Sequence, residues 1–246
     1  MEGEAPDRVI DCPVCGAAAF TRLFVKRDQQ FVKCAGCGLV LINPRPFLAA
    51  LRAVYDEHYS GGYIRKADSK KKRARQRVAL LQRRFGLQGR WLDVGCSAGF
   101  LVAAAAAAGF DACGVDVEEA GIAYARETLG LANVHCGPLE AIGLPGGAFN
   151  VITMYDVIEH VPDLNQLVPE LKRLLAPGGV LHVRTPDVGH WRRPRDLSAW
   201  SEVKPSEHLY YFDKRTLPRL LARHGLRLRA NYFTWKSALS MVFEHA

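Results

Sequence analysis

The segment between Arg90 and Ala108 constrains the fold of this 246-residue chain more than any other. A short apolar run ends at Val94, Gly95 follows, and apolar residues and alanines with high helix propensity then continue to Ala108. This order predicts a strand, a tight glycine turn and a helix. Glycines let a ligand approach the backbone, and the N–H groups of the first helical turn would face that ligand. The segment therefore predicts a nucleotide-binding corner.

An acidic residue at the end of the next expected strand narrows the choice of ligand. Asp116 lies 21 residues after Gly95, where a carboxylate can accept hydrogen bonds from both ribose hydroxyls. The loop itself runs Asp93-x-Gly95-x-x-x-Gly99 and lacks the third glycine of dinucleotide-binding loops. An acid just before the turn suits a ligand with a positive centre better than a pyrophosphate. An ordinary turn between a strand and a helix is the alternative interpretation.

Five short motifs, in the right order, resemble those of class I S-adenosylmethionine-dependent methyltransferases of the ubiquinone-type subgroup. They are the glycine loop, Gly114-Val115-Asp116, and the segments 149–161, 174–179 and 207–212. The third contains Glu159-His160-Val161, which is similar to the "EHV" extension of strand four in that subgroup. The resemblance covers most of the chain. It implies a Rossmann-like α/β fold with a doubly wound, mostly parallel sheet, and S-adenosylmethionine as the methyl donor.

The resemblance also implies a donor site at the carboxyl ends of the strands. Asp93, Gly95 and Gly99 would bind the amino-acid part of the donor, and Asp116 would bind its ribose. Val117 would pack on the adenine. The other implied donor-site residues are Cys96 in the loop, Leu139 with its backbone N–H toward the adenine, Tyr155 along the methionine part, and Tyr63 over the donor carboxylate. For Tyr63 a purely structural aromatic stripe is the alternative, and Cys96 also fits a small buried residue.

Methyl transfer to a hydroxyl or an acidic carbon requires a base, and histidine suits this task because its ordinary pKa is about 6.5. We favour His208, with Glu207 and Tyr210 expected to orient its ring, over His160. A packing or helix-start role is the alternative for His160, and a capping role is the alternative for His208. The resemblance adds a divalent ion held by three side chains as a further alternative: Glu159, His160 and Asp163.

Four of the seven cysteines form two C-x-x-C pairs, Cys12/Cys15 and Cys34/Cys37, separated by 18 residues. This spacing is typical of a structural zinc site with two knuckles. A glycine follows each pair and allows a tight turn. A segment this short has too little core to fold alone, so the metal would supply stability. We expect structural Zn²⁺ without a catalytic role; redox pairs, or a site that has lost its metal, are the alternatives.

A basic run between residues 65 and 84 contributes much of the net charge of +8. Beside a zinc ribbon, this run makes nucleic acid a candidate partner. However, Ala74, Val78, Leu81 and Phe85 recur at intervals of four and three, which indicates one apolar stripe of a helix with its charged faces in water. We therefore favour a helix that covers the sheet.

Composition and turn residues divide the chain. Residues 1–45 are the predicted zinc ribbon, and residues 46–246 are the predicted methyltransferase domain. Within it, 186–212 is predicted to form a lid, whose basic cluster 191–195 suits an anionic acceptor. No apolar run reaches the roughly 18 residues of a membrane span, and the acidic start lacks the apolar segment of a signal peptide. We therefore expect a cytoplasmic protein.

Strands and helices are expected to alternate, which predicts a parallel sheet covered on both faces. The expected strands are 90–94, 111–116, 133–136, 148–154, 179–184 and 226–233. The expected helices are 98–108, 118–129, 164–175 and 214–224, with two more between 47 and 85. Only 237–246 remain for a final antiparallel strand, so we expect a short chain end there.

Three classes of function stay open. The first and favoured is methylation of a small molecule by O-, C- or N-transfer, of which we favour O- or C-transfer. The second is an RNA or protein methyltransferase that uses the ribbon and the basic helix, although Met154-Tyr155-Asp156-Val157 differs from the motif of enzymes that methylate exocyclic amines. The third is a non-catalytic scaffold that binds S-adenosylmethionine. The sequence leaves the oligomeric state open.

Overall fold

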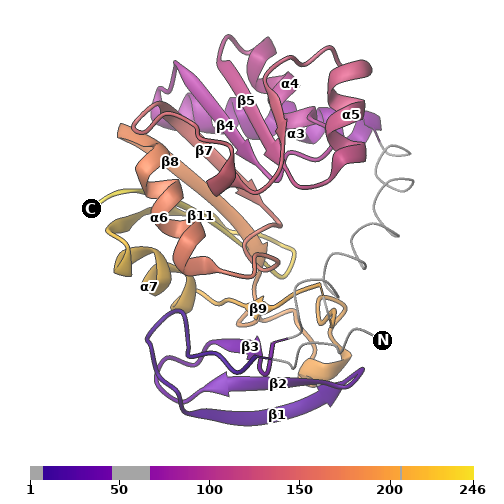
Figure 1. Cartoon of the computed structure of the whole chain (residues 1–246), viewed down its shortest axis with the longest axis vertical. Coiled ribbons are helices and arrows are strands. Elements are labelled where there is room, and N and C mark those ends of the chain that lie inside the picture. The colour runs from indigo at the N-terminus through magenta and orange to yellow at the C-terminus, as the bar shows by residue number, and fades with distance from the viewer. Residues whose placement is uncertain (1–7, 46–66, 206) are drawn as a thin grey trace.

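The computed structural model describes residues 8–45, 67–205 and 207–246, which form two sheets (Figure 1). The larger sheet has seven strands in the order β10-β11-β8-β7-β4-β5-β6. Its five parallel strands are β4 (Arg90–Val94), β5 (Asp111–Asp116), β6 (Val134–Cys136), β7 (Phe149–Tyr155) and β8 (Leu175–Pro186). The doubly wound, mostly parallel fold predicted from the sequence is confirmed.

Two antiparallel strands, β10 (Leu226–Asn231) and β11 (Ala238–His245), complete this sheet beside β8. The ten residues left at the chain end therefore suffice for the final strand. The strand β8 begins four residues earlier than predicted, because Leu175 already pairs with Phe149, ahead of an irregularity in the register between β7 and β8. Helix α6 accordingly ends at Leu174.

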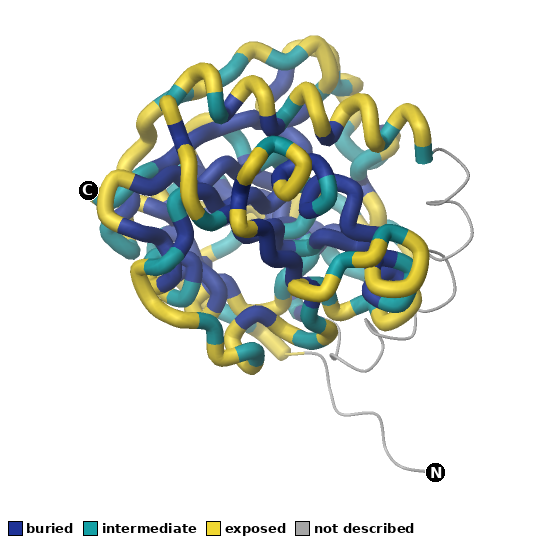
Figure 2. The backbone as a smooth tube through the Cα atoms, turned by 90° about the horizontal axis from the view of Figure 1, so that it is seen from above, coloured by how far each residue is buried: buried dark blue, intermediate teal, exposed yellow. Residues whose placement is uncertain are grey.

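Helices cover both faces of the large sheet. α3 (Ala67–Phe85), α4 (Phe100–Ala107) and α5 (Glu119–Glu127) contribute to one hydrophobic cluster, and α6 (Leu164–Leu174) and α7 (Thr216–Arg223) contribute to the other. In α6 the side chain of Asp163 caps the first turn, accepting hydrogen bonds from the N–H groups of Asn165 and Gln166. Seen from above, buried backbone fills the interior and exposed turns surround it (Figure 2). None of the described helices has the length and apolar composition that a membrane span requires.

The smaller sheet combines the predicted ribbon with the predicted lid. Its strands are β1 (Phe20–Lys26), β2 (Gln29–Cys34), β3 (Val40–Ile42) and β9 (Tyr210–Tyr211), paired in that order and all antiparallel. A separate hydrophobic cluster joins the ribbon to the insertion: Phe31, Val40, Ile42, Trp200, Val203 and Tyr211. The insertion therefore packs firmly against the ribbon, because β9 extends the ribbon sheet and the insertion contributes side chains to the shared hydrophobic cluster.

The smaller sheet lies beyond the carboxyl ends of the parallel strands (Figure 1). One short segment connects the two sheets: the N–H of Leu209 donates to the carbonyl of Glu159 at 2.7 Å, and the carbonyl of Leu209 accepts from the N–H of Ile42 at 3.1 Å. The guanidinium of Arg45 donates to the hydroxyl of Tyr210 at 2.6 Å. These contacts place the ribbon at the edge of the large sheet where parallel α/β folds bind their ligands.

Candidate active site

The loop from β4 to α4 is shaped by a glycine with no room for a side chain. Gly95 has φ of 74°, and a Cβ on it would lie 2.2 Å from Cγ2 of Val157. The N–H groups of Gly95 and Cys96 both donate to the carbonyl of Val115, at 2.8 and 3.1 Å. The loop is thereby bound to the end of β5, at the point where the sheet order reverses between β4 and β7.

Asp116 is held in place by two backbone donors. Its Oδ2 accepts from the N–H of Ser97 at 2.7 Å, and its Oδ1 accepts from the N–H of Glu118 at 2.8 Å. Burial raises the pKa of this carboxyl, and the backbone hydrogen bonds oppose that rise. Each oxygen retains a second lone pair, so the carboxylate can still accept from two hydroxyl groups.

Asp93 is buried at the end of β4. Its Oδ1 accepts from the hydroxyl of Thr153 at 2.7 Å, and that hydroxyl oxygen accepts from the indole N–H of Trp91 at 3.0 Å. Burial raises the pKa of Asp93 to about 7, against the lowering effects of the Thr153 hydrogen bond and the nearby positive charge of Arg77. Its charge therefore changes near neutral pH, and a cationic ligand would favour the ionised form.

The other predicted donor-site residues have distinct surroundings. A Cβ on Gly99 would lie 2.7 Å from Cδ1 of Leu131, so close packing already requires a glycine there. Cys96 is buried beside Gly114, and burial raises the pKa of its thiol, so this side chain packs as a small buried residue. Val117 is 64% exposed, so its side chain is accessible to a ligand. Leu139 starts the short helix η1 (Leu139–Ala141), and Tyr63 lies outside the described residues.

A second cluster surrounds Tyr155, and it contains residues that the sequence interpretation missed. The guanidinium carbon of Arg77, from α3, lies 4.3 Å from the centre of the Tyr155 ring. The Tyr155 hydroxyl is 2.8 Å from Nδ1 of His182, whose Nε2 is 2.9 Å from the hydroxyl of Ser240. Burial lowers the pKa of both Arg77 and His182 and raises that of Tyr155.

The position of Arg77 corrects the expectation that the charged faces of α3 all meet water. The apolar stripe itself is confirmed, since Ala74, Val78 and Leu81 are buried. Arg77 lies within that stripe, three residues after Ala74 and four before Leu81. This spacing is the signal that could have identified it. None of the ion pairs among the described residues includes Arg77.

The two candidate histidines meet at the junction of the sheets. The rings of His160 and His208 lie edge to face, with their centres 4.6 Å apart. Nδ1 of His160 is 2.8 Å from the carbonyl of Glu207, and Nδ1 of His208 is 2.8 Å from the carbonyl of Glu202. Because a carbonyl only accepts, both rings carry their proton on Nδ1, which leaves the basic lone pair on Nε2.

These contacts differ from the expected ones. Backbone carbonyls orient the rings, whereas the Glu207 side chain lies 3.9 Å from the ammonium of Lys204 and the hydroxyl of Tyr210 contacts Arg45. Burial lowers the pKa of His160 to about 4 and that of His208 to about 3. Both rings are therefore neutral at pH 7.

The carboxyl of Glu159 lies beside the two histidines. Its Oε2 accepts from the hydroxyl of Thr185 at 2.9 Å, and its buried Oε1 has no hydrogen-bond partner. Burial raises the pKa of this carboxyl to about 8. One ligand atom from each of Glu159, His160 and His208 lies within 4.8 Å of the others, which is a set suited to a proton relay or to a divalent ion. The predicted third ligand, Asp163, instead caps α6.

The methyltransferase domain family matches residues 63–231 of the chain, more than half of its length. The chain belongs to this family. Among curated relatives, it is 35% identical over 122 residues to a ubiquinone biosynthesis O-methyltransferase of Methylococcus capsulatus, covering 44% of the chain and 48% of the relative. It is 34% identical over 96 residues to a probable S-adenosylmethionine-dependent methyltransferase of Mycolicibacterium smegmatis, covering 39% and 37%. These alignments span about half the length of the relatives or less.

Solved structures support the same fold. A TehB-like S-adenosylmethionine-dependent methyltransferase from Corynebacterium glutamicum aligns with a TM-score of 0.57 at 16% identity, covering 79% of this chain and all of the other. An S-adenosylmethionine-dependent methyltransferase from Aquifex aeolicus aligns with a TM-score of 0.53 at 21% identity, covering 68% and 88%. The chain therefore has the class I methyltransferase fold that its motifs resemble.

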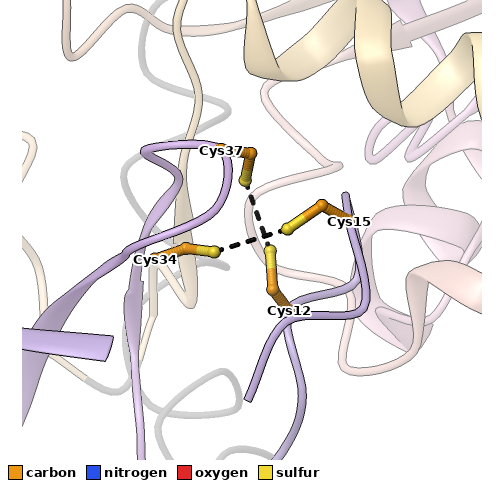
Figure 3. A group of neighbouring side chains, drawn as sticks. All are labelled: Cys12, Cys15, Cys34 and Cys37. Atoms are coloured by element: carbon orange, nitrogen blue, oxygen red, sulfur yellow. Dashed lines mark hydrogen bonds between the residues drawn. The ribbon is translucent and has the colours of Figure 1, made fainter. Parts of the chain in front are cut away.

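The four ribbon cysteines converge on one point, although they come from two knuckles that are separated in the sequence (Figure 3). Sγ of Cys12 lies 3.5 Å from Sγ of Cys37, and Sγ of Cys15 lies 3.5 Å from Sγ of Cys34. The N–H of the glycine after each pair donates to the backbone carbonyl of the first cysteine of that pair: Gly16 to Cys12 at 2.7 Å and Gly38 to Cys34 at 2.9 Å. A tetrahedral zinc with Zn–S bonds of about 2.3 Å requires sulfurs about 3.8 Å apart. The set therefore fits zinc.

Proposed function

We propose that this methyltransferase binds S-adenosylmethionine at the corner of the Gly95 loop and transfers its methyl group to a small-molecule acceptor, through oxygen or carbon. When bound, the donor would supply a methyl already activated by a positive sulfur. The protein would then align the acceptor and remove its proton. The observation that carries the proposal is the convergence of Asp93, Asp116 and Arg77 at one edge of the sheet.

Each of these three side chains matches a different part of the donor. Asp116 is held by backbone donors and can accept from the ribose hydroxyls. Asp93 offers a buried carboxyl to the ammonium of the methionine part. Arg77 is partly buried, lies over Tyr155 and belongs to none of the ion pairs within the described ranges. We assign it to the donor carboxylate, which would give the guanidinium a charged partner.

For the proton we propose the histidine pair. His160 is only partly buried, whereas His208 is 3% exposed, so His160 is better placed to meet an acceptor. The contacts thus reverse our initial preference for His208 as the direct base. The ring of His208, whose centre lies 4.6 Å from that of His160, would pack against the base, and the carbonyl of Glu207 would orient it. A neutral imidazole with its lone pair on Nε2 is the form that can accept the proton of the acceptor at pH 7.

We further propose one structural Zn²⁺ in the cysteine cluster. Four thiolates fill a tetrahedron, which leaves no open position for substrate. Elemental analysis of protein purified without chelator should find one zinc per chain, and the Cys12→Ser variant should lose it. Less than half an equivalent in the wild type would contradict the site. A second equivalent that disappears in His208→Ala would instead assign a metal to the histidine pair.

The alternative of a nucleic-acid substrate loses part of its support. Arg77, one of the cations of the basic run, lies over Tyr155. In the insertion, Arg193 donates to the carbonyls of Val188, Pro194 and Arg195, so this side chain stabilises the loop. The third alternative, a non-catalytic scaffold, would bind donor but transfer no methyl group.

Donor binding can be tested with a residue that the fold does not need. Val117 is 64% exposed, so Val117→Glu should leave folding intact and weaken S-adenosylmethionine binding at least tenfold by placing a charge against the adenine. Val25→Glu, at a 46% exposed position on β1, is the matched control and should bind donor normally. Equal affinities for both variants in calorimetry would refute the donor site.

A further inference from the structure

Two neighbouring loops expose three large aromatic side chains. Trp191 follows β8 and is 69% exposed, while Phe233 and Trp235 lie between β10 and β11 and are 70% and 69% exposed. Most large apolar side chains of the described residues are buried, so three aromatic rings on adjoining loops require an explanation.

The two loops are bound to each other, so the rings belong to one surface. The carbonyl of Thr234 accepts from Nε2 of His190 at 3.2 Å, and Nδ1 of His190 accepts from the N–H of Arg192 at 3.1 Å. A backbone hydrogen bond of 3.0 Å joins Asp187 to Ser237. The loops therefore present their aromatic rings from a fixed base.

Two cationic residues are sequence neighbours of the two tryptophans. The guanidinium carbon of Arg192 lies 5.4 Å from the centre of the Trp191 ring, and Lys236 is exposed beside Trp235. We define the aromatic surface by five residues: Trp191, Arg192, Phe233, Trp235 and Lys236.

We propose that the aromatic surface docks this protein on an anionic membrane. Tryptophan and phenylalanine at loop tips enter the boundary between headgroups and acyl chains, and flanking cations attract anionic lipids. The net charge of +8 adds long-range attraction to such a membrane. The loops lie at the edge of the sheet that holds the candidate active site, so docking would turn this edge toward the lipid.

The arrangement of the rings favours a membrane over a nucleic acid. Single strands bind to aromatic faces that stack successive bases along a basic groove. Here Phe233 and Trp235 lie edge to face, at 84°, and Trp191 stacks on His190 with one of its faces. Rings that contact each other in this way suit insertion into lipid better than stacking between bases.

The experiment is sedimentation of the full chain with vesicles of phosphatidylcholine, with or without phosphatidylglycerol. We expect binding to the anionic vesicles, reduced by salt, and a loss of roughly tenfold or more in the Trp191→Ser/Phe233→Ser/Trp235→Ser variant. Arg192→Ser/Lys236→Ser should weaken binding to anionic vesicles alone. Leu23→Ser/Val25→Ser is the control, because these exposed apolar residues lie on β1, outside the aromatic surface.

Tryptophan fluorescence supplies a second readout, independent of methyl transfer. Brominated lipids should quench Trp191 and Trp235, whereas Trp91 and Trp200 are buried and should stay unquenched. Wild type that stays in the supernatant with anionic vesicles would overturn the proposal. So would equal binding by the aromatic variant and the control, or quenching by an RNA oligonucleotide with none by lipid.

Discussion

The buried carboxyl of Asp93 should make donor binding depend on pH. Its pKa is raised to about 7, mainly by burial, so the carboxyl loses its charge when the pH falls through neutrality. The donor carries a positive ammonium, which favours the ionised carboxylate. Only the protein molecules with an ionised Asp93 bind the donor well. The apparent dissociation constant therefore rises as this binding-competent fraction falls.

The size of the effect follows from that fraction. With a pKa of about 7, about nine-tenths of the protein is competent at pH 8 and about a tenth at pH 6, so affinity should fall about tenfold between them. Asp93→Asn cannot titrate, so it should bind weakly at both pH values and with nearly equal affinity. Thr153→Val should move the transition to higher pH, because its hydroxyl stabilises the ionised form.

The assay is calorimetric titration with S-adenosylmethionine and with S-adenosylhomocysteine, which lacks the sulfonium but keeps the ammonium. Both should show the same pH dependence if Asp93 acts on the ammonium. Wild-type affinity that is constant from pH 6 to pH 8 would refute the reasoning, and so would a dependence that persists in Asp93→Asn.

Three further predictions follow from single contacts. Cys12→Ser should lower the free energy of unfolding by about 3 kcal/mol or more, which corresponds to a fall in Tm of about 10 °C, since an incomplete metal site stabilises the ribbon poorly. An unchanged Tm would count against structural zinc. Gly95→Ala should destabilise the fold by about 1–3 kcal/mol, because its Cβ would lie 2.2 Å from Cγ2 of Val157 at positive φ, and Val157→Ala should recover part of the loss in a double-mutant cycle. Additive effects would contradict this clash. Once an acceptor is known, His160→Ala should slow transfer by about 10²–10⁴ without changing donor affinity; a variant that keeps more than a tenth of wild-type turnover would exclude His160 as the base.

Local patterns predicted the large sheet well. Each parallel strand is a short apolar run between turn residues, and burial on both faces permits few other conformations for such runs. The corner around Gly95 was also predictable, because a strand, a glycine and an alanine-rich helix follow one another directly. The spacing of the two C-x-x-C pairs likewise indicated that the four cysteines lie together, as they do, and the segment between the pairs forms the hairpin of β1 and β2.

Contacts between segments that are distant in the sequence could not be predicted from local patterns. Nothing near Tyr210 indicates that it pairs with Leu41, 169 residues earlier, or that the predicted lid completes the ribbon sheet. The carbonyl that orients His160 belongs to Glu207, 47 residues later in the sequence, and the carbonyl of Glu202 orients His208, so the expected roles of the Glu207 and Tyr210 side chains differed from the structure. Arg77 was missed because a charged residue in a basic run was assigned to solvent, although its spacing matched the buried stripe.

The most direct test of the account is a crystal structure of the protein with S-adenosylhomocysteine. We predict that the ribose hydroxyls donate to Asp116, that the adenine packs on Val117, and that the ligand carboxylate lies within hydrogen-bonding distance of Arg77. A ligand bound elsewhere, or bound at this corner with its ribose away from Asp116, would contradict the central claim.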